Sequence, residues 1–211
     1  MYMKTKRLLD IIISLTGFIV LSPIFILLIL AIKIDSKGPV LFKQKRVGIY
    51  KRHFHILKFR TMRIDTPKDT PTHMLDNPER YITKVGKFLR MTSLDELPQI
   101  WNIFIGQMSI IGPRPALWNQ YDLVAERDKY GANNVPTGLT GWAQINGRDE
   151  LPIELKAKLD GEYVQKVSIL MDAKCFFGTI ISVVKSDGVI EGGNRPANEN
   201  EIAATKKQAN H

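Results

Sequence analysis

Residues 11–32 read IIISLTGFIVLSPIFILLILAI, a stretch without a charged side chain in which Leu, Ile, Val and Phe dominate. About 20 such residues in a helix, each adding about 1.5 Å, are long enough to cross the hydrocarbon core of a bilayer. A cleavable signal peptide would have a shorter apolar core followed by a small-residue cleavage site. This run instead continues into Lys33-Ile34-Asp35, so it is interpreted as a retained membrane segment.

The flanks and the middle of this stretch favour a helix that enters and leaves the membrane by the same face. Basic residues mark the cytoplasmic side of a membrane, and here they lie on both sides: Lys4, Lys6 and Arg7 before the run, and Lys33, Lys37, Lys43, Lys45 and Arg46 after it. Pro23 has no N–H for the carbonyl four residues back, so a kink is expected there, and the Ser22 hydroxyl can bond the freed carbonyl. The alternative is a straight span with a mild kink.

The composition limits what the rest of the chain can be. With 211 residues, 44% of them hydrophobic and 24% charged, the chain suits one compact domain. Its net charge of +9 indicates an anionic partner, which composition alone leaves open among nucleic acid, an anionic membrane surface and a phosphorylated substrate. The single cysteine, Cys175, excludes an intramolecular disulfide and is interpreted as an inert packed thiol.

The pattern after the membrane segment predicts a mainly α body with a small β-hairpin, an α+β fold. Residues 40–44 and 54–59 are predicted strands around Gly48, and the proline-rich residues 65–78 are a predicted loop. Predicted helices cover residues 81–90, a segment from near Asp95 to Gly106, residues 116–130 closed by Gly131, and residues 150–167 and 169–186. The expected organisation is a re-entrant membrane helix at 1–34, a cytosolic catalytic domain at 35–190 and a polar C-terminal tail at 191–211.

The most informative stretch is TSLDELPQ, residues 92–99, with its adjacent acidic pair. Ser93 and Glu96 fit a capping box, whereas Asp95 as the N-cap places Pro98 where no helical hydrogen bond is lost. Both registers put the two carboxylates at a helix start, which attracts anions and favours the ionised form of Asp95. An ionised aspartate can attack phosphorus, and adjacent carboxylates suit Mg²⁺. The alternative is that both residues only cap the helix.

Basic side chains near turns and strand ends strengthen the catalytic interpretation. They are Lys58, Arg60, Arg90, Arg114 and Arg148. The loop Gly112-Pro113-Arg114-Pro115 is rigid and would hold one guanidinium still for bidentate contact with phosphate. A diphosphate donor and a phosphate acceptor together need several such groups.

The sequence resembles the monotopic phosphoglycosyl transferases, the bacterial sugar transferase family, over nearly its whole length. Six segments carry the resemblance in order: Lys6-Arg7-Leu8-Leu9-Asp10, Leu21-Ser22-Pro23, Lys58-Phe59-Arg60-Thr61-Met62, Ser93-Leu94-Asp95-Glu96-Leu97-Pro98-Gln99, Gly112-Pro113-Arg114-Pro115, and Gly138-Leu139-Thr140-Gly141-Trp142-Ala143-Gln144-Ile145-Asn146-Gly147-Arg148. One departure is Pro136-Thr137-Gly138, where the family often has Arg-Pro-Gly, which puts one basic contact in doubt.

The resemblance implies a re-entrant helix broken at Ser22-Pro23, with the catalytic body on the cytoplasmic face of the bacterial inner membrane. Asp95 would attack the β-phosphate of a UDP-sugar beside Mg²⁺, releasing UMP and leaving a covalent phosphosugar that passes to undecaprenyl phosphate. Glu96 would hold the metal or accept a proton, and Arg90, Arg114 and Asp172 would be phosphate and active-site contacts.

The resemblance also implies a place in glycan assembly. The short length is similar to members that act early in capsule, O-antigen or glycoprotein glycan assembly, with downstream glycosyltransferases as expected partners. Residues 115–121 resemble capsule enzymes that use an N-acetylated 6-deoxyhexose.

Two rival functions remain at the level of sequence. A basic, membrane-tethered binder of nucleic acid or lipid headgroups explains the charge and the anchor but gives the acidic pair no role. An enzyme with the same pair and a different lipid or nucleotide is the second. No Walker loop or G-x-G-x-x-G occurs, and His53 and His55 have no evident third metal ligand. Aromatic-interleaved basic stretches are absent apart from residues 53–60, so nucleic acid is not the expected partner.

Overall fold

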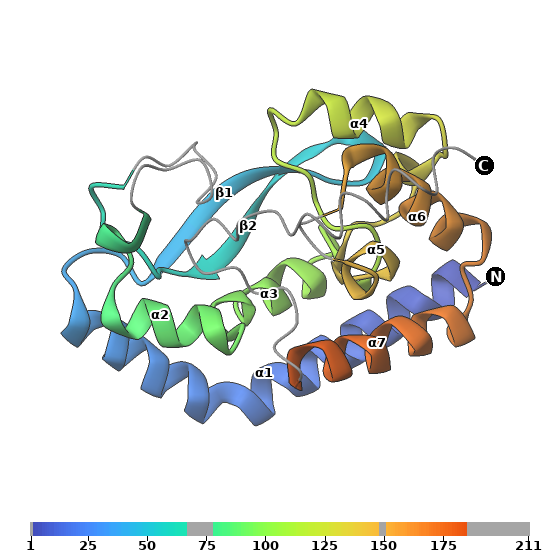
Figure 1. Ribbon diagram of the computed structural model, residues 1–211. Helices are drawn as coiled ribbons and strands as arrows, with labels where there is room; N and C mark the ends of the chain where they lie inside the picture. The colour runs from blue at the N-terminus through green and yellow to red at the C-terminus, as the bar shows by residue number, and fades with distance from the viewer. Residues whose placement is uncertain (1, 67–77, 148–150, 185–211) are drawn as a thin grey trace.

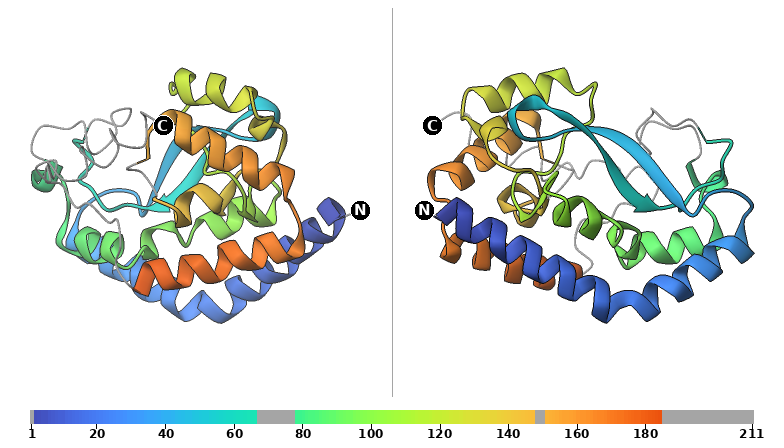
Figure 2. Two further views of the ribbon diagram at one scale, coloured as in Figure 1. Left: turned by 45° about the vertical axis from the view of Figure 1, so that its right-hand side comes forward. Right: turned by 180° about the vertical axis from the view of Figure 1, so that it is seen from behind.

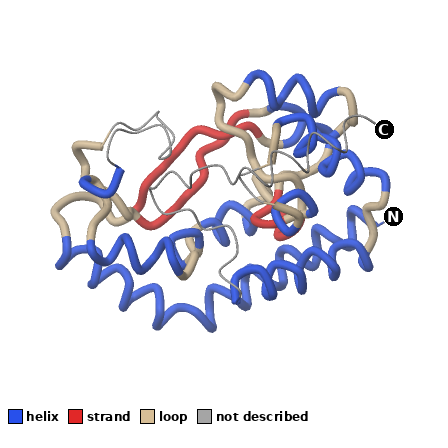
Figure 3. Tube along the Cα trace, in the orientation of Figure 1, coloured by secondary structure: helices blue, strands red, loops and turns tan. Residues whose placement is uncertain are grey.

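The computed structural model of the chain describes residues 2–66, 78–147 and 151–184. Its helices are α1 (Tyr2–Asp35), α2 (Lys84–Met91), α3 (Gln99–Phe104), α4 (Tyr121–Asp128), α5 (Trp142–Ile145), α6 (Ile153–Gln165) and α7 (Ile169–Val184). Its strands are β1 (Leu41–Val47), β2 (His53–Phe59), β3 (Ser109–Ile111) and β4 (Gly138–Thr140), and short 3-10 turns include η4 (Leu94–Glu96) and η5 (Ala132–Asn134). The predicted mainly helical body with a hairpin is confirmed (Figures 1 and 3).

Helix α1 forms one side of the molecule and bends in its middle, so that both of its arms rise toward the rest of the chain (Figures 1 and 2). Pro23 lies inside the helix, and the Ser22 hydroxyl donates to the Ile19 carbonyl at 2.8 Å. That carbonyl is the one Pro23 leaves without an amide donor, so the predicted hydroxyl–carbonyl bond is confirmed. Within residues 2–66, 78–147 and 151–184, α1 is the one helix long and apolar enough to cross a membrane.

Both ends of α1 are fastened to the same body. Near its start, Arg7 donates to the last carbonyls of α3 at 2.6 and 2.7 Å, and Asp10 accepts the Ile110 amide at 3.0 Å. At its other end, Asp35 accepts the Val85 amide of α2 at 3.0 Å. The polar ends of the helix are therefore held on one side of it, while the large apolar residues between them remain mostly exposed.

The β-hairpin lies on the far side of α2 and α3 from α1 (Figure 1). Strands β1 and β2 pair antiparallel from Leu41 opposite Phe59 to Val47 opposite His53, which confirms the two predicted strands and extends them to seven residues each. The buried Asn102 of α3 joins helix to hairpin, because its side chain accepts one β2 amide at 3.0 Å and donates to a β2 carbonyl at 2.8 Å.

Two predictions about the later segments are wrong in detail. Helix α4 begins at Tyr121 and not at residue 116, because Ala116 accepts the Val47 amide at 2.9 Å and extends the end of β1. Gly131 lies beyond the helix cap, Lys129, and adopts φ +67° at the start of η5. The parallel pair β3–β4, which was not predicted, brings the segments around Gly112 and Gly138 together.

The last two predicted helices are confirmed over the described residues as α6 and α7. Cys175 of α7 is fully buried beside Ile111, Tyr163 and Met171. The prediction of a packed thiol is confirmed, and burial with the nearby Asp172 carboxylate raises the pKa of the thiol to about 11, which agrees with low reactivity. Most of the predicted loop 65–78 and the whole predicted tail 191–211 lie outside the described residues.

Candidate active site

The acidic pair lies in the 3-10 turn η4, between α2 and α3. Ser93 adopts the left-handed conformation, φ +56°, and turns the chain out of α2 into η4. Neither predicted capping register occurs: the Ser93 side chain makes no capping hydrogen bond, and α3 begins after Pro98. No helix begins at Ser93 or Asp95 because the left-handed Ser93 interrupts the helical path just before the two carboxylates. Such a strained serine costs about 1–3 kcal/mol and is typical of functional turns.

Two cations from separate elements meet the acidic pair. The Lys58 ammonium, from β2, lies 2.7 Å from Glu96 Oε1 and 3.4 Å from Asp95 Oδ2. The Arg114 guanidinium, from the loop after β3, donates to the same Glu96 oxygen at 2.9 Å. The side chains of Asp95 and Glu96 are only 12% and 18% exposed, so these charges interact in a partly desolvated environment.

The two carboxyls respond differently to this environment. Burial raises the pKa of Asp95 above its ordinary value, with Lys58 and Arg90 opposing the rise and Glu96 adding to it. This corrects the expectation that the helix start would favour the ionised Asp95. For Glu96, burial also raises the pKa, but Arg114 and Lys58 together outweigh it and hold the pKa well below its ordinary range. Glu96 is therefore a fixed anion at neutral pH.

The loop that carries Arg114 is held by close backbone packing. The Gly138 amide donates to the Pro113 carbonyl at 2.9 Å, and the Gly112 amide donates to the Thr140 carbonyl at 2.8 Å. A Cβ on Gly138 would lie 2.1 Å from the Gly112 nitrogen, and one on Gly141 would lie 2.1 Å from the Gly112 oxygen. Glycine is required at these positions because the two backbones touch. The motif containing Gly138 and Gly141 thus fixes the loop that presents the guanidinium.

Arg90 reaches the site from α2. Its charge lowers the pKa of Asp95, and its Nε donates to the Thr61 hydroxyl at 2.9 Å. Thr61 orients this arginine but was not predicted as a site residue. Its position between Arg60 and Met62, inside a segment that carries the family resemblance, was the available signal.

Two other predicted site residues, Arg60 and Asp172, lie away from the acidic pair. Arg60 is buried and donates to the carbonyls of Ser36 and Lys37 at 2.7 and 2.8 Å, so it caps the chain leaving α1. Asp172 lies at the start of α7 in a separate polar cluster. Arg148 lies outside the described residues.

The cluster around Asp172 joins both ends of the described chain. Its carboxylate accepts the hydroxyls of Tyr2 at 2.6 Å and Tyr163 at 2.7 Å, and it pairs with the Lys6 ammonium. The side chains of Lys6 and Asp172 are 5% and 13% exposed. Asp172 therefore links the first arm of α1 to α7, and its predicted contact with phosphate stays a prediction.

The acidic pair has donor atoms that fit Mg²⁺. Among the described residues, the second oxygen of Asp95 accepts no hydrogen bond, which leaves it available to a cation or a phosphorus atom. No group of three or more His, Cys, Asp and Glu side chains that could hold a metal occurs in ranges 2–66, 78–147 and 151–184. Mg²⁺ needs no such cage, since it is usually bound by one or two carboxylates together with substrate phosphates.

The arrangement combines one partly uncommitted carboxylate with three neighbouring cations. Lysine and arginine side chains can hold phosphate oxygens and stabilise charge that develops on them. A carboxylate next to them can attack phosphorus and form an acyl phosphate. The geometry is suited to phosphoryl chemistry on an anionic substrate.

Comparison with known proteins agrees with this chemistry. The family model described as "Bacterial sugar transferase" matches residues 1–186. A UDP-glucose:undecaprenyl-phosphate glucose-1-phosphate transferase of Klebsiella pneumoniae is 40% identical over 191 residues, which cover 84% of this chain and 40% of that protein. An undecaprenyl-phosphate glucose phosphotransferase of Komagataeibacter xylinus is 38% identical over 84% of this chain and 35% of its own length.

A shorter relative matches along most of its length. The exopolysaccharide production protein ExoY of Sinorhizobium fredii is 35% identical over 87% of each chain. The chain thus spans two fifths or less of the first two relatives and most of the third.

Proposed function

The chain belongs to the bacterial sugar transferase family, and on that premise we propose that it moves a sugar 1-phosphate from a UDP-sugar to undecaprenyl phosphate and releases UMP. The observation that carries the proposal is the acidic pair of η4 bridged by Lys58. One cation joins both carboxylates, a second fixes Glu96, and Asp95 keeps one oxygen without a hydrogen bond among the described residues. A lipid- or nucleic-acid-binding protein without chemistry would not need this arrangement.

The proposed reaction has two displacements at one phosphorus atom. In the first, the Asp95 carboxylate attacks the β-phosphorus, a P–O bond to Asp95 forms, and the bond from that phosphorus to the bridging oxygen of UMP breaks. In the second, an oxygen of undecaprenyl phosphate attacks the same phosphorus, and the bond to Asp95 breaks. The products are the polyprenyl diphosphosugar and free Asp95 carboxylate, so each step exchanges one P–O bond for another.

The neighbouring residues have separate roles in this proposal. Lys58, Arg90 and Arg114 would bind the diphosphate oxygens and stabilise charge as UMP leaves. Glu96 would keep Lys58 and Arg114 in place, since its low pKa makes it a weak proton acceptor at neutral pH. Mg²⁺, held by Asp95 with Glu96 nearby, would supply positive charge against the phosphates.

The proposed location is the cytoplasmic face of the bacterial inner membrane, with α1 re-entrant. Support comes from the bend at Pro23 and from the fastening of both ends of α1 to one body by Arg7, Asp10 and Asp35. A straight span would place one set of these bonds on the opposite side of the membrane from its partners. Lysines on both flanks agree with a common cytoplasmic side.

The sugar and the pathway form the finer part of the proposal. Two relatives carry glucose in their names, whereas residues 115–121 resemble enzymes for an N-acetylated 6-deoxyhexose. We place the reaction at the start of capsule, O-antigen or glycoprotein glycan assembly, ahead of downstream glycosyltransferases.

The decisive assay measures UMP release by the full chain in lipid nanodiscs. UDP-glucose, its N-acetylated counterpart and an N-acetylated 6-deoxy UDP-sugar are each supplied with Mg²⁺ and undecaprenyl phosphate. The expected result is UMP release with at least one donor, dependent on the lipid for multiple turnovers. UMP release with none of them, from protein that remains folded, would reject the proposal for this donor class.

A further inference from the structure

Gln44 lies on the face of the β-hairpin that carries Lys58. In the register of the two strands, Gln44 is directly opposite Ile56, which packs on α3, and it is therefore a diagonal neighbour of Lys58 on that inner face. Diagonal neighbours in an antiparallel pair lie about 7–8 Å apart, within reach of long side chains. Because Lys58 bridges the acidic pair, Gln44 lies one side chain away from the two carboxylates.

The guanidinium of Arg46 fixes the orientation of the Gln44 side chain. Arg46 Nη2 donates to Gln44 Oε1 at 2.6 Å, and Arg46 Nη1 donates to the Pro115 carbonyl at 3.0 Å. A guanidinium has no acceptor, so the amide must present its oxygen to Arg46 and its nitrogen elsewhere. Pro115 follows Arg114, which donates to the acidic pair. Arg46 thus joins the Gln44 amide to the loop that presents the Arg114 guanidinium.

The amide nitrogen of Gln44 has donors that the described part of the chain does not use. Gln44 is half-buried, and within residues 2–66, 78–147 and 151–184 its side chain makes the one hydrogen bond through its oxygen. An amide with its oxygen engaged and its two N–H groups open is suited to a ligand with hydroxyl or carbonyl oxygens. A UDP-sugar carries such oxygens on its sugar.

The order of the two proposed displacements indicates which part of the substrate faces the hairpin. If each displacement is in line, UMP leaves and the lipid phosphate enters on the side of phosphorus opposite Asp95. Because the acceptor is carried by a membrane lipid, that side is open toward α1. The hairpin lies beyond α2 and α3 from α1 (Figure 1). The sugar stays on phosphorus through both steps and is the group left to face the hairpin.

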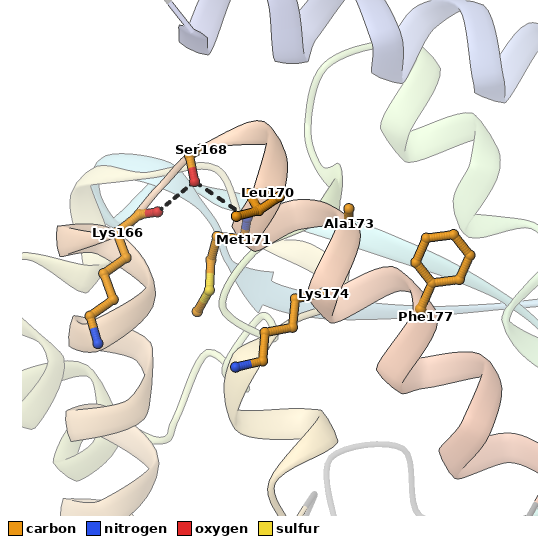
Figure 4. Close-up of a pocket in the computed structure, with 7 residues that line it drawn as sticks. All are labelled: Lys166, Ser168, Leu170, Met171, Ala173, Lys174 and Phe177. Atoms are coloured by element: carbon orange, nitrogen blue, oxygen red, sulfur yellow. Dashed lines mark hydrogen bonds between the residues drawn. The ribbon is translucent and has the colours of Figure 1, made fainter.

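A separate hollow on the surface offers no comparable contact. It lies at the start of α7 (Figure 4), and none of its lining residues belongs to the acidic pair or its cations: Lys166, Ser168, Leu170, Met171, Ala173, Lys174 and Phe177. The Ser168 hydroxyl is already engaged, because it donates to the Lys166 carbonyl at 3.0 Å and accepts the Met171 amide at 3.3 Å. Contacts with the sugar are therefore expected beside the acidic pair.

We propose that Gln44 binds the sugar of the UDP-sugar, and of the phosphosugar on Asp95, by donating from its amide nitrogen to a hydroxyl or acetamido oxygen. Arg46 is a positioning residue, because it orients this amide and supports the loop of Arg114. The inference rests on the proposed transferase function. It adds a contact to the part of the donor that the cations of the site do not bind.

Calorimetric titration of the full chain in nanodiscs with Mg²⁺ tests the contact. An Asp95→Asn background prevents turnover, and the ligands are UDP and the three UDP-sugars of the UMP-release assay. Gln44→Met removes the amide and keeps a side chain of similar length. Gln165→Met makes the same change at an exposed position at the end of α6 and is the matched control. Arg46→Met removes the positioning group.

Gln44→Met should raise the Kd of at least one UDP-sugar by about threefold to tenfold, the effect of one lost hydrogen bond, and leave the Kd of UDP within about twofold. Retained binding of UDP also shows that the site is folded. Arg46→Met should weaken the binding of UDP and UDP-sugars alike, because it releases the loop of Arg114, and Gln165→Met should change neither.

Two results would overturn the inference. Equal weakening of UDP and every UDP-sugar in Gln44→Met would mean that Gln44 only supports Arg46 or contacts the nucleotide. An unchanged Kd for every UDP-sugar would mean that Gln44 makes no contact. Either result, found while the parent with Asp95 releases UMP, rejects this inference alone. Absence of UMP release by the folded parent rejects the proposed function instead.

Discussion

Replacing Asp95 with asparagine should abolish chemistry while leaving the fold nearly unchanged. The side chain keeps its size, and the contact it loses is the 3.4 Å approach of Lys58, which retains Glu96 at 2.7 Å. The pair is partly buried, but Lys58 keeps its closer partner Glu96 and the substitution leaves no unpaired charge behind. The expected cost is therefore about 1 kcal/mol, that of one lost hydrogen bond. The expected change in melting temperature for a chain of this size is therefore within about 2–4 °C.

The effect on catalysis should be far larger. Loss of the nucleophile removes the covalent route, so turnover should fall at least about 10⁴-fold, equivalent to about 5.5 kcal/mol in the barrier. The assay is intact-protein mass spectrometry after incubation with UDP-sugar and Mg²⁺ but no polyprenyl phosphate, together with UMP release. The parent should carry one phosphosugar and Asp95→Asn none. Asp122→Asn makes the same chemical change at an exposed position and should behave as the parent. An Asp95→Asn protein that turns over within about tenfold of the parent would refute the mechanism.

Three further outcomes are expected. Because only ionised Asp95 can attack and burial raises its pKa above 3.8, kcat/KM should fall on acidification at a higher pH than an ordinary aspartate gives, and a pH–rate profile without that limb would contradict this. Arg127→Met should destabilise the fold by about 3–5 kcal/mol, because it leaves the buried Asp160 carboxylate without the guanidinium that now lies 2.6 Å from it. Lowering the pH should reduce this loss as Asp160 takes up a proton. Thermal unfolding of parent and variant across a range of pH measures both the loss and its pH dependence. Replacing Ser22 and Pro23 with alanine should straighten α1, so that an impermeant thiol reagent reaches a cysteine at position 2 or 37 from outside the cell, whereas in the parent it reaches neither.

The sequence was sufficient for the elements whose pattern is long or strongly apolar. The uninterrupted run in α1, the Pro23 kink with its Ser22 bond and the alternation in β1 and β2 were all predictable from local chemistry. Strands β3 and β4 were not, because three residues each carry too little periodicity and depend on contact between distant glycines. The late start of α4 also depends on a contact between distant residues, because the Ala116 carbonyl accepts the Val47 amide at the end of β1 and so lies outside the helix.

Around the acidic pair, the sequence predicted which side chains come together better than it predicted how they are arranged. Asp95, Glu96, Lys58 and Arg114 come together as their residue types suggested. The left-handed Ser93 was not predictable, because serine gives no local signal for positive φ. The opposite pKa shifts of the two carboxyls also depend on cations 18 to 38 positions away in the chain.

The Asp172 cluster can form only late in synthesis, because it joins the first residues of the chain to α7. Tyr2 and Lys6 precede their shared partner by 170 and 166 positions. At a translation rate of about 5–20 residues per second, the Lys6 ammonium waits about 8–33 s for its counter-ion. During that interval its charge is hydrated, and hydration opposes its passage into lipid. In the proposed re-entrant topology, this hydrated charge favours keeping the first arm of α1 on the side of synthesis until α7 can receive it.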